Sequence, residues 1–308
     1  MIFKRDNFIV FACSVIGASH VKNNKPCQDD SFGEKGKRYR FIAVADGHGG
    51  EAYFRSDTGS HFAIEAVRRC VFNPAVVDVL NKLSADSDAD ANEKKREQII
   101  LQLKKSIVSK WNSLIAGHIT AHPFTEAELA VLPAKNAEEY RAGENIETAY
   151  GSTIISVLWT DSFLLTLQIG DGTCVMLNNE AEFSQPVPVD EKCFLNVTTS
   201  LCDKNAIDSF RHFYSDKWSV LSDQEKIIRC PQPAAVLIGT DGIDDCFAGA
   251  EKLFDFYRVV LSSFTEKDEE TAKAELKDYF PRLSEKGSGD DISIGIIADI
   301  EMLRTMKQ

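Results

Sequence analysis

Aspartate stands beside glycine in four short turns, and each turn lies where an apolar run begins or ends. A single Asp-Gly turn after a strand is common, because glycine tolerates positive φ. Several such turns in one chain, together with an acidic pair at Asp29 and Asp30 that lacks the glycine, indicate that these carboxylates contribute to one site. The four turns are VADGHGG with Asp46, QIGDGT with Asp171, IGTDGIDD with Asp241, Asp244 and Asp245, and GSGDDISIG with Asp290 and Asp291.

These carboxylates could converge, because strand ends of one sheet meet at a common edge. Clustered carboxylates repel one another and raise each other's pKa values unless a cation lies among them. Hard oxygen ligands of this kind select Mg²⁺ or Mn²⁺, with water in the remaining positions. Two such ions could share Asp46 and make a water between them acidic enough to act as a nucleophile near neutral pH. The adjacent glycines would let backbone carbonyls approach the ions closely.

A histidine, His48, follows Asp46 by two residues. There it could protonate a leaving oxygen, although a histidine at a strand end can also be purely structural. Asp244 and Asp291 adjoin the candidate ligands, and we expect them to support those ligands or to face solvent. The histidines in helical or loop sequence are expected to be structural or solvated; these are His61, His118, His122 and His212.

The elements that must position these residues are short strands and amphipathic helices. Runs of β-branched and aromatic residues bounded by turn signals predict strands. The runs 153–159 and 163–169 form a hairpin, so this part of the sheet is antiparallel. Apolar residues at helical spacing predict helices, the last of which we expect Pro281 to stop. The predicted strands are 8–16, 39–45, 153–159, 163–169, 234–240 and 292–300, and the predicted helices are 60–72, 96–117, 251–264 and 269–280.

Two polar segments lie between these elements. Residues 84–97 are predicted to be an exposed loop that leads into a helix, and residues 121–148 to be rich in loops. Neither is typical of a domain linker, because strand pairing resumes beyond it. We therefore expect one domain over residues 1–308. Antiparallel strands with the helices set apart indicate the α+β class, built in layers.

The composition is that of a globular protein, with 308 residues of which 44% are hydrophobic and 27% charged. The net charge of −12 argues against binding to nucleic acid or to acidic membranes, which depends on basic patches. The eight cysteines form no C-x-x-C pair, which favours free thiols in a reducing cytosol and hence a cytoplasmic protein. The first residues resemble a secretory signal peptide, but we interpret them as leading into a first buried strand. We expect a monomer.

Six motifs occur in the order and spacing of a known family: Gly17 to Asp29, DGHGG, GST at 151–153, GDG, TDGIDD and GDDIS. Over about residues 10–300 the chain resembles the metal-dependent protein serine/threonine phosphatases, the PPM or type 2C family. NVTTS at 196–200 is similar to a stretch of some bacterial members, and we discount its match to a glycosylation acceptor. The resemblance implies an α-β-β-α sandwich, in which two mainly antiparallel sheets are flanked by helices.

The resemblance also implies roles for the candidate residues. Asp46 would bridge two Mg²⁺ or Mn²⁺ ions, and the carbonyl of Gly47 would complete the second site. Asp241 and Asp290 would bind the first ion, and Asp29 would hold metal-bound water.

A third ion and a proton donor are implied in the same way. Asp171 and Asp245, together with Asp241, match the positions that form a third metal site in related enzymes. His48 matches the histidine proposed to protonate the leaving alkoxide.

The chain departs from the family pattern around its first motif and in its flap. Many relatives carry an arginine before a Glu-Asp pair, where this chain has SHVKNNKPCQDD with Gln28 in place of the glutamate. His20, Lys22 or Lys25 could partly replace that arginine in phosphate binding, although lysine is a point charge and not a bidentate fork. Residues 178–232 differ from the usual flap sequence, so we expect a variable flap-like segment there.

We therefore predict an enzyme that hydrolyses phosphoserine and phosphothreonine in phosphorylated proteins by a metal-activated water. Two alternatives stay open at this point. One is a non-catalytic phosphatase-like module with a broken metal site, against which the presence of Asp46, Asp241 and Asp290 argues. The other is the same chemistry on a small phosphoester, which the sequence does not separate from the first prediction.

Overall fold

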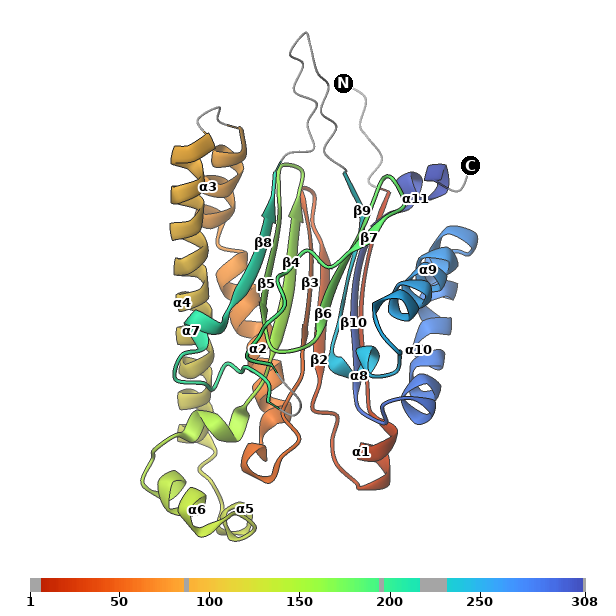
Figure 1. Ribbon diagram of the computed structural model, residues 1–308. Coiled ribbons are helices and arrows are strands. Elements are labelled where there is room, and N and C mark those ends of the chain that lie inside the picture. Colours follow the sequence, from red (N-terminus) through yellow and green to blue (C-terminus); the bar gives the residue numbers. More distant parts are fainter. Residues whose placement is uncertain (1–6, 86–88, 194–196, 217–231, 307–308) are drawn as a thin grey trace.

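Two five-stranded sheets form the centre of the computed structural model, which describes residues 7–85, 89–193, 197–216 and 232–306 (Figure 1). Every strand pair in both sheets is antiparallel. The first sheet has the order β1-β10-β9-β6-β7 and the second the order β2-β3-β4-β5-β8. The strands are β1 Phe8–Val15, β2 Asp30–Lys35, β3 Tyr39–Ala45, β4 Ile154–Thr160, β5 Leu164–Ile169, β6 Thr173–Asn178, β7 Phe183–Ser184, β8 Arg211–Ser215, β9 Pro233–Gly239 and β10 Ile292–Asp299.

Helices cover the outer faces of both sheets (Figure 1). Helix α2 packs on the second sheet with α4 and α3 behind it, and α9, α10 and α11 cover the first sheet. In the described part of the chain, no helix combines the length and apolar character that a membrane crossing requires. The helices are α1 Ala18–Lys22, η1 Glu51–Tyr53, α2 Ser56–Val71, α3 Pro74–Ala85, α4 Ala89–Ala121, α5 Glu126–Ala130, α6 Ala134–Arg141, η2 Ile146–Tyr150, α7 Ala206–Ser209, α8 Asp241–Asp244, α9 Ala250–Glu266, α10 Glu269–Lys286 and α11 Ile300–Met306.

Three hydrophobic clusters separate these four layers. One lies between the second sheet and α2 and α4, and includes Phe41 and Trp111. A second lies between the first sheet and α9 and α10, and includes Tyr257 and Phe280. The third lies between the two sheets and includes Val157. The predicted α-β-β-α sandwich is therefore confirmed.

The predicted strands and the hairpin are also found, whereas two helix boundaries were wrong. Helix α10 continues past Pro281 to Lys286, because the turn beyond the proline is held from outside: the Ser284 hydroxyl donates to the Asp290 carbonyl at 2.8 Å and accepts from the Ala18 amide at 3.0 Å. These contacts offset the backbone hydrogen bond that proline cannot make. The predicted loop 84–97 is largely helical, since α4 begins at Ala89.

Two segments were predicted to be rich in loops or to form a variable flap, and both contain regular elements. The stretch 121–148 contains α5 and α6 as well as loops, and the segment 178–232 contributes β7, α7 and β8. Residues 194–196 and 217–231 of that segment lie outside the described residues, as do Asn196 of the discounted glycosylation pattern and Cys230. The seven cysteines in the described ranges are free thiols, as predicted.

The turns that carry the candidate ligands lie at one end of both sheets. Strands β3 and β5 of the second sheet and β9 of the first sheet end there, and β10 begins there, opposite the end of β9. We expected the strand ends of one sheet to supply the carboxylates. Both sheets supply them instead, because the sheets stack face to face and their ends meet.

Candidate metal centre and active site

Three of the predicted ligands come together at this end of the molecule. Asp46 follows β3, Asp171 follows β5 and Asp241 opens α8 after β9. One carboxylate oxygen from each lies within 4.8 Å of the others. The three side chains are far apart in the sequence, and the antiparallel pairing of two sheets brings them to one point.

The electrostatics of this cluster favour a bound cation. Burial and the charges of Asp29, Asp241, Asp290 and Asp171 raise the pKa of Asp46 well above its ordinary value. Burial and the neighbouring carboxylates raise the pKa of Asp241 to about 7. Within the described residues, Oδ1 of Asp171 is buried without a hydrogen-bond partner. Crowded carboxylates with a buried oxygen left free are the donor set that a divalent ion would satisfy.

The two other predicted ligands stand at the rim of the cluster. Asp290 precedes β10, and its side chain is 54% exposed. Its charge acts on both Asp46 and Asp241. Asp245 is exposed just after α8, and its pKa is raised by burial and by the charges of Asp171 and Asp290. The Asp290 carboxylate itself groups with His20 and Asp291, with one ligand atom of each within 4.8 Å of the others. Asp290 and Asp245 therefore act on the centre through their charges.

Gly47 is required by the space around it. A Cβ atom at this position would lie 2.5 Å from the carbonyl oxygen of Ser56 and 2.6 Å from that of Gln28, which no side chain can accept. The Gly47 amide instead donates to the Gln28 carbonyl at 3.1 Å. The turn after Asp46 is thus clamped between the segment before β2 and the start of α2.

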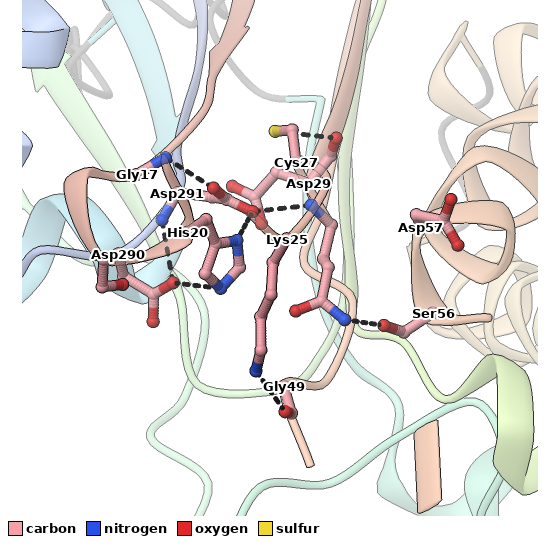
Figure 2. A network of polar contacts seen from close by, with 12 residues as sticks. Gly17, His20, Lys25, Cys27, Asp29, Gly49, Ser56, Asp57, Asp290 and Asp291 are labelled. Carbon is pink, nitrogen blue, oxygen red and sulfur yellow. Dashed lines mark hydrogen bonds and ion pairs between the residues drawn. The ribbon is translucent and has the colours of Figure 1, made fainter. Parts of the chain in front are cut away.

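Behind the cluster lie two buried carboxylates with different surroundings. Asp29 accepts a hydrogen bond from the Thr240 hydroxyl at 2.9 Å, and burial together with the charge of Asp291 raises its pKa well above the ordinary value. Asp291 accepts from the backbone amides of Gly17 and Gln28, both at 2.6 Å (Figure 2). Asp291 is 3% exposed. We expected Asp291 either to support the ligands or to face solvent. Its burial excludes the second role, and its bonds to two backbone amides agree with the first.

His48 lies near the centre, where the charge of Asp171 acts on its ring. Its ring packs edge-on against Tyr53, with the ring centroids 4.8 Å apart, and its backbone amide donates to the Gly151 carbonyl at 3.1 Å. Burial lowers the pKa of His48, and the charges of Asp171 and Asp203 oppose that effect. The imidazole is thus held next to the carboxylates in a partly buried position.

The three cations predicted to bind phosphate are placed differently from one another. His20 is buried, with Nδ1 at 2.9 Å from Asp291 and Nε2 at 3.8 Å from Asp290 (Figure 2). Lys25 reaches across the turn that follows His48, and its ammonium group donates to the Gly49 carbonyl at 3.3 Å (Figure 2). Lys22 is exposed at the end of α1.

An arginine that the sequence analysis missed also approaches the centre. Arg211 of β8 donates to the carbonyl of Gly170, directly before Asp171, and to the carbonyl of Pro188 at 2.8 Å. It lines a cavity of about 280 Å³ together with Asp171 and Asp190. Nothing local in the sequence indicates the contact of Arg211 with the Asp171 turn, because strand β8 shows no regular burial pattern.

Comparisons with known proteins agree with this geometry. The sequence profile of the protein phosphatase 2C family matches residues 16–280. The structure is similar to the catalytic domain of the serine/threonine protein phosphatase PstP in complex with two manganese ions, with 16% identity, a TM-score of 0.53, and coverage of 94% of this chain and 97% of that one.

Two further solved structures are similar over comparable lengths. PppA of Pseudomonas aeruginosa is 15% identical with a TM-score of 0.52, covering 94% of this chain and 97% of its own. The serine/threonine phosphatase Stp1 of Staphylococcus aureus is 12% identical with a TM-score of 0.53, covering 94% of each chain. A search of curated protein sequences gave no match.

Proposed function

The chain belongs to the protein phosphatase 2C family, and from this premise we propose how its residues carry out metal-dependent hydrolysis of phosphoserine and phosphothreonine in proteins. The observation that carries the proposal is the convergence of Asp46, Asp171 and Asp241 within 4.8 Å at the end of two stacked sheets. Their raised pKa values and the unpartnered oxygen of Asp171 support a cation at this point.

The proposed ions are two Mg²⁺ or Mn²⁺, and Asp46 would serve both of them. The carbonyl of Gly47 would hold the second ion, and Asp241 and Asp290 would hold the first. The manganese ions of the similar phosphatase PstP support this choice of metal. When bound, the ions would lower the pKa of water and so supply the nucleophile.

A third ion is proposed on the outer side of the same centre. Its ligands would be Asp171, Asp241 and Asp245. Asp29 is buried and accepts a hydrogen bond from the Thr240 hydroxyl. From there it would hold water of the core ions.

His48 delivers a proton to the leaving alkoxide oxygen of serine or threonine. Its packing against Tyr53 and the bond from its amide to Gly151 hold the ring on the wall of the centre. Burial favours the neutral ring, whereas a phosphate dianion beside it would favour the protonated ring that a general acid requires.

Lys25 is the cation that we propose for binding the substrate phosphate. Its ammonium group lies over the turn after His48, at the exposed side of the centre. His20 is engaged with Asp291 and Asp290, so a role in positioning these carboxylates suits it better than phosphate binding. The exposed Lys22 would add positive charge at the entrance.

We also propose a cytoplasmic, monomeric enzyme whose partners are phosphorylated proteins. A net charge of −12 supports the expectation that nucleic acid and acidic membranes are not among them. The alternative of a non-catalytic module is not favoured, because the acidic ligand set is complete. The alternative of a small phosphoester substrate is tested by comparing phosphopeptides with phosphorylated metabolites at equal Mn²⁺ concentration.

The substitution Asp46→Asn tests the proposed centre. The variant should lose turnover of p-nitrophenyl phosphate with Mn²⁺ by several orders of magnitude, because one side chain serves two ions, while its circular dichroism spectrum stays unchanged. Asp161→Asn is the matched control, since Asp161 is 54% exposed in the β4–β5 turn. A pure wild-type protein that stays inert with Mn²⁺, or an Asp46→Asn variant with near wild-type turnover, would refute the proposal.

A further inference from the structure

Gln28 lies beside the active site but has no part in the chemistry described so far. Its side chain is buried, and the whole residue is 8% exposed. The side-chain amide nitrogen donates to the His48 carbonyl at 3.1 Å and to the Ser56 hydroxyl at 2.5 Å. One side chain thus joins the turn that carries the general acid to the first residue of α2.

The backbone of Gln28 makes two more bonds to the same region. Its amide donates to Asp291 at 2.6 Å, and its carbonyl accepts from the Gly47 amide at 3.1 Å. These two bonds to buried groups fix the backbone of Gln28. Its side chain can therefore hold the His48 carbonyl and the Ser56 hydroxyl in place.

His48 needs such support on its carbonyl side. Its amide is held by Gly151 and its ring by Tyr53. The chain then continues into Gly49 and Gly50, which are both exposed. A pair of glycines permits many backbone conformations, so these residues do not fix the peptide group that follows His48. The bond from Gln28 does.

This bond requires an amide and not a carboxylate. The His48 carbonyl can only accept a hydrogen bond, so the nitrogen of the Gln28 side chain must face it. Ionised glutamate, which many relatives carry at this position, has no donor for that carbonyl. In this chain the bond therefore depends on the amide of Gln28.

We infer that Gln28 is a positioning residue, which holds the backbone of His48 so that its imidazole stays on the leaving-group side of the centre. The inference rests on the proposed role of His48 as general acid. A competing interpretation uses the other end of the amide. The side-chain oxygen Oε1 of Gln28 is buried without a hydrogen-bond partner among the described residues, and in this interpretation it would bind one of the proposed ions or accept a hydrogen bond from their water.

The two interpretations differ for the variants Gln28→Glu and Gln28→Met. A donor that positions His48 is lost in both, so kcat for a phosphoserine peptide should fall about tenfold in both, the rate equivalent of one hydrogen bond. The loss should be smaller than threefold for p-nitrophenyl phosphate, because p-nitrophenolate leaves without a proton. Mn²⁺ affinity of Gln28→Met, measured by calorimetry, should stay within twofold of wild type.

Gln98→Glu is the matched control, because it makes the same exchange on an exposed position of α4 and should leave both rates unchanged. A Gln28→Glu variant as active as wild type on the peptide would overturn the inference, as would equal losses on both substrates accompanied by weaker Mn²⁺ binding in Gln28→Met. An inert wild-type protein would instead overturn the proposed function, and the inference with it.

Discussion

Replacing Asp291 by asparagine tests what holds the acidic turns in place. The carboxylate is buried, and its two oxygens accept backbone hydrogen bonds from Gly17 and Gln28, both at 2.6 Å. These partners stand 274 and 263 residues away along the chain. Asparagine has the same shape but only one oxygen, so its NH₂ group must face one of the two amides.

The expected cost follows from the bond that is lost. A hydrogen bond to a charged acceptor contributes about 1.5–3 kcal/mol, and a buried donor left unpaired costs about 1–3 kcal/mol. These contributions overlap, and the pair with His20 is weakened as well. We therefore expect the free energy of unfolding of the metal-free protein to fall by about 3 kcal/mol in Asp291→Asn.

Urea unfolding of the metal-free protein, followed by circular dichroism, measures this change. Asp290→Asn is a sharp control, because it makes the same substitution at the next residue, whose side chain is 54% exposed. Removing that charge relieves repulsion within the cluster, so the control should be neutral or stabilising. The reasoning is refuted if Asp291→Asn loses less than about 0.5 kcal/mol, or if both variants lose the same amount.

Two further predictions concern pH and the missed arginine. The pKa of Asp241 is raised to about 7 in the folded protein, so between about pH 4 and 7 the folded state binds more protons than the unfolded state. The contribution of protonated Asp241 to stability is therefore lost as the pH rises through this range. In the metal-free protein at pH 7, Asp241→Asn should therefore raise the free energy of unfolding by roughly 2 kcal/mol, and a gain that is equally large at pH 4 would contradict this. Arg211→Met removes hydrogen bonds to the carbonyls of Gly170 and Pro188 and should lower the free energy of unfolding by about 1–3 kcal/mol. Arg38→Met, at a side chain that is 79% exposed, should leave it unchanged. Equal unfolding temperatures of the two variants would show that these bonds of Arg211 do not stabilise the fold.

Strands β4 and β9 could be predicted from the sequence because their own residues determine them. All seven positions of β4 and of β9 are buried, so an unbroken apolar run marks each strand. Strands β2, β6, β7 and β8 were missed. In the edge strands β2 and β8 the side chains are mostly half-buried and show no clear alternation. Their backbones are held by pairing with β3 and β5, which are distant contacts that local patterns do not encode.

The candidate ligands could be predicted for a similar reason, whereas the backbone groups that Asp291 and Gln28 bind could not. Glycine beside aspartate at a strand end is a local signal, and it marked Asp46, Asp171 and Asp241. Asp291 and Gln28 act on backbone groups that fold beside them from remote segments. Their function depends on three-dimensional neighbours, and the same residue types at the same spacing elsewhere would have none of it.

The two kinds of carboxylate divide the work of the centre. Those that face one another, such as Asp46 and Asp241, have raised pKa values and destabilise the folded protein near neutral pH when no cation lies among them. Behind them, the two carboxylate oxygens of Asp291 accept hydrogen bonds from the backbone amides of Gly17 and Gln28 and so hold the turns together. Because the support does not depend on the facing carboxylates, the geometry persists while they repel. A divalent ion at the proposed centre would relieve this repulsion in a preformed site. Its binding free energy would then add to the stability of the fold instead of being used to build the site.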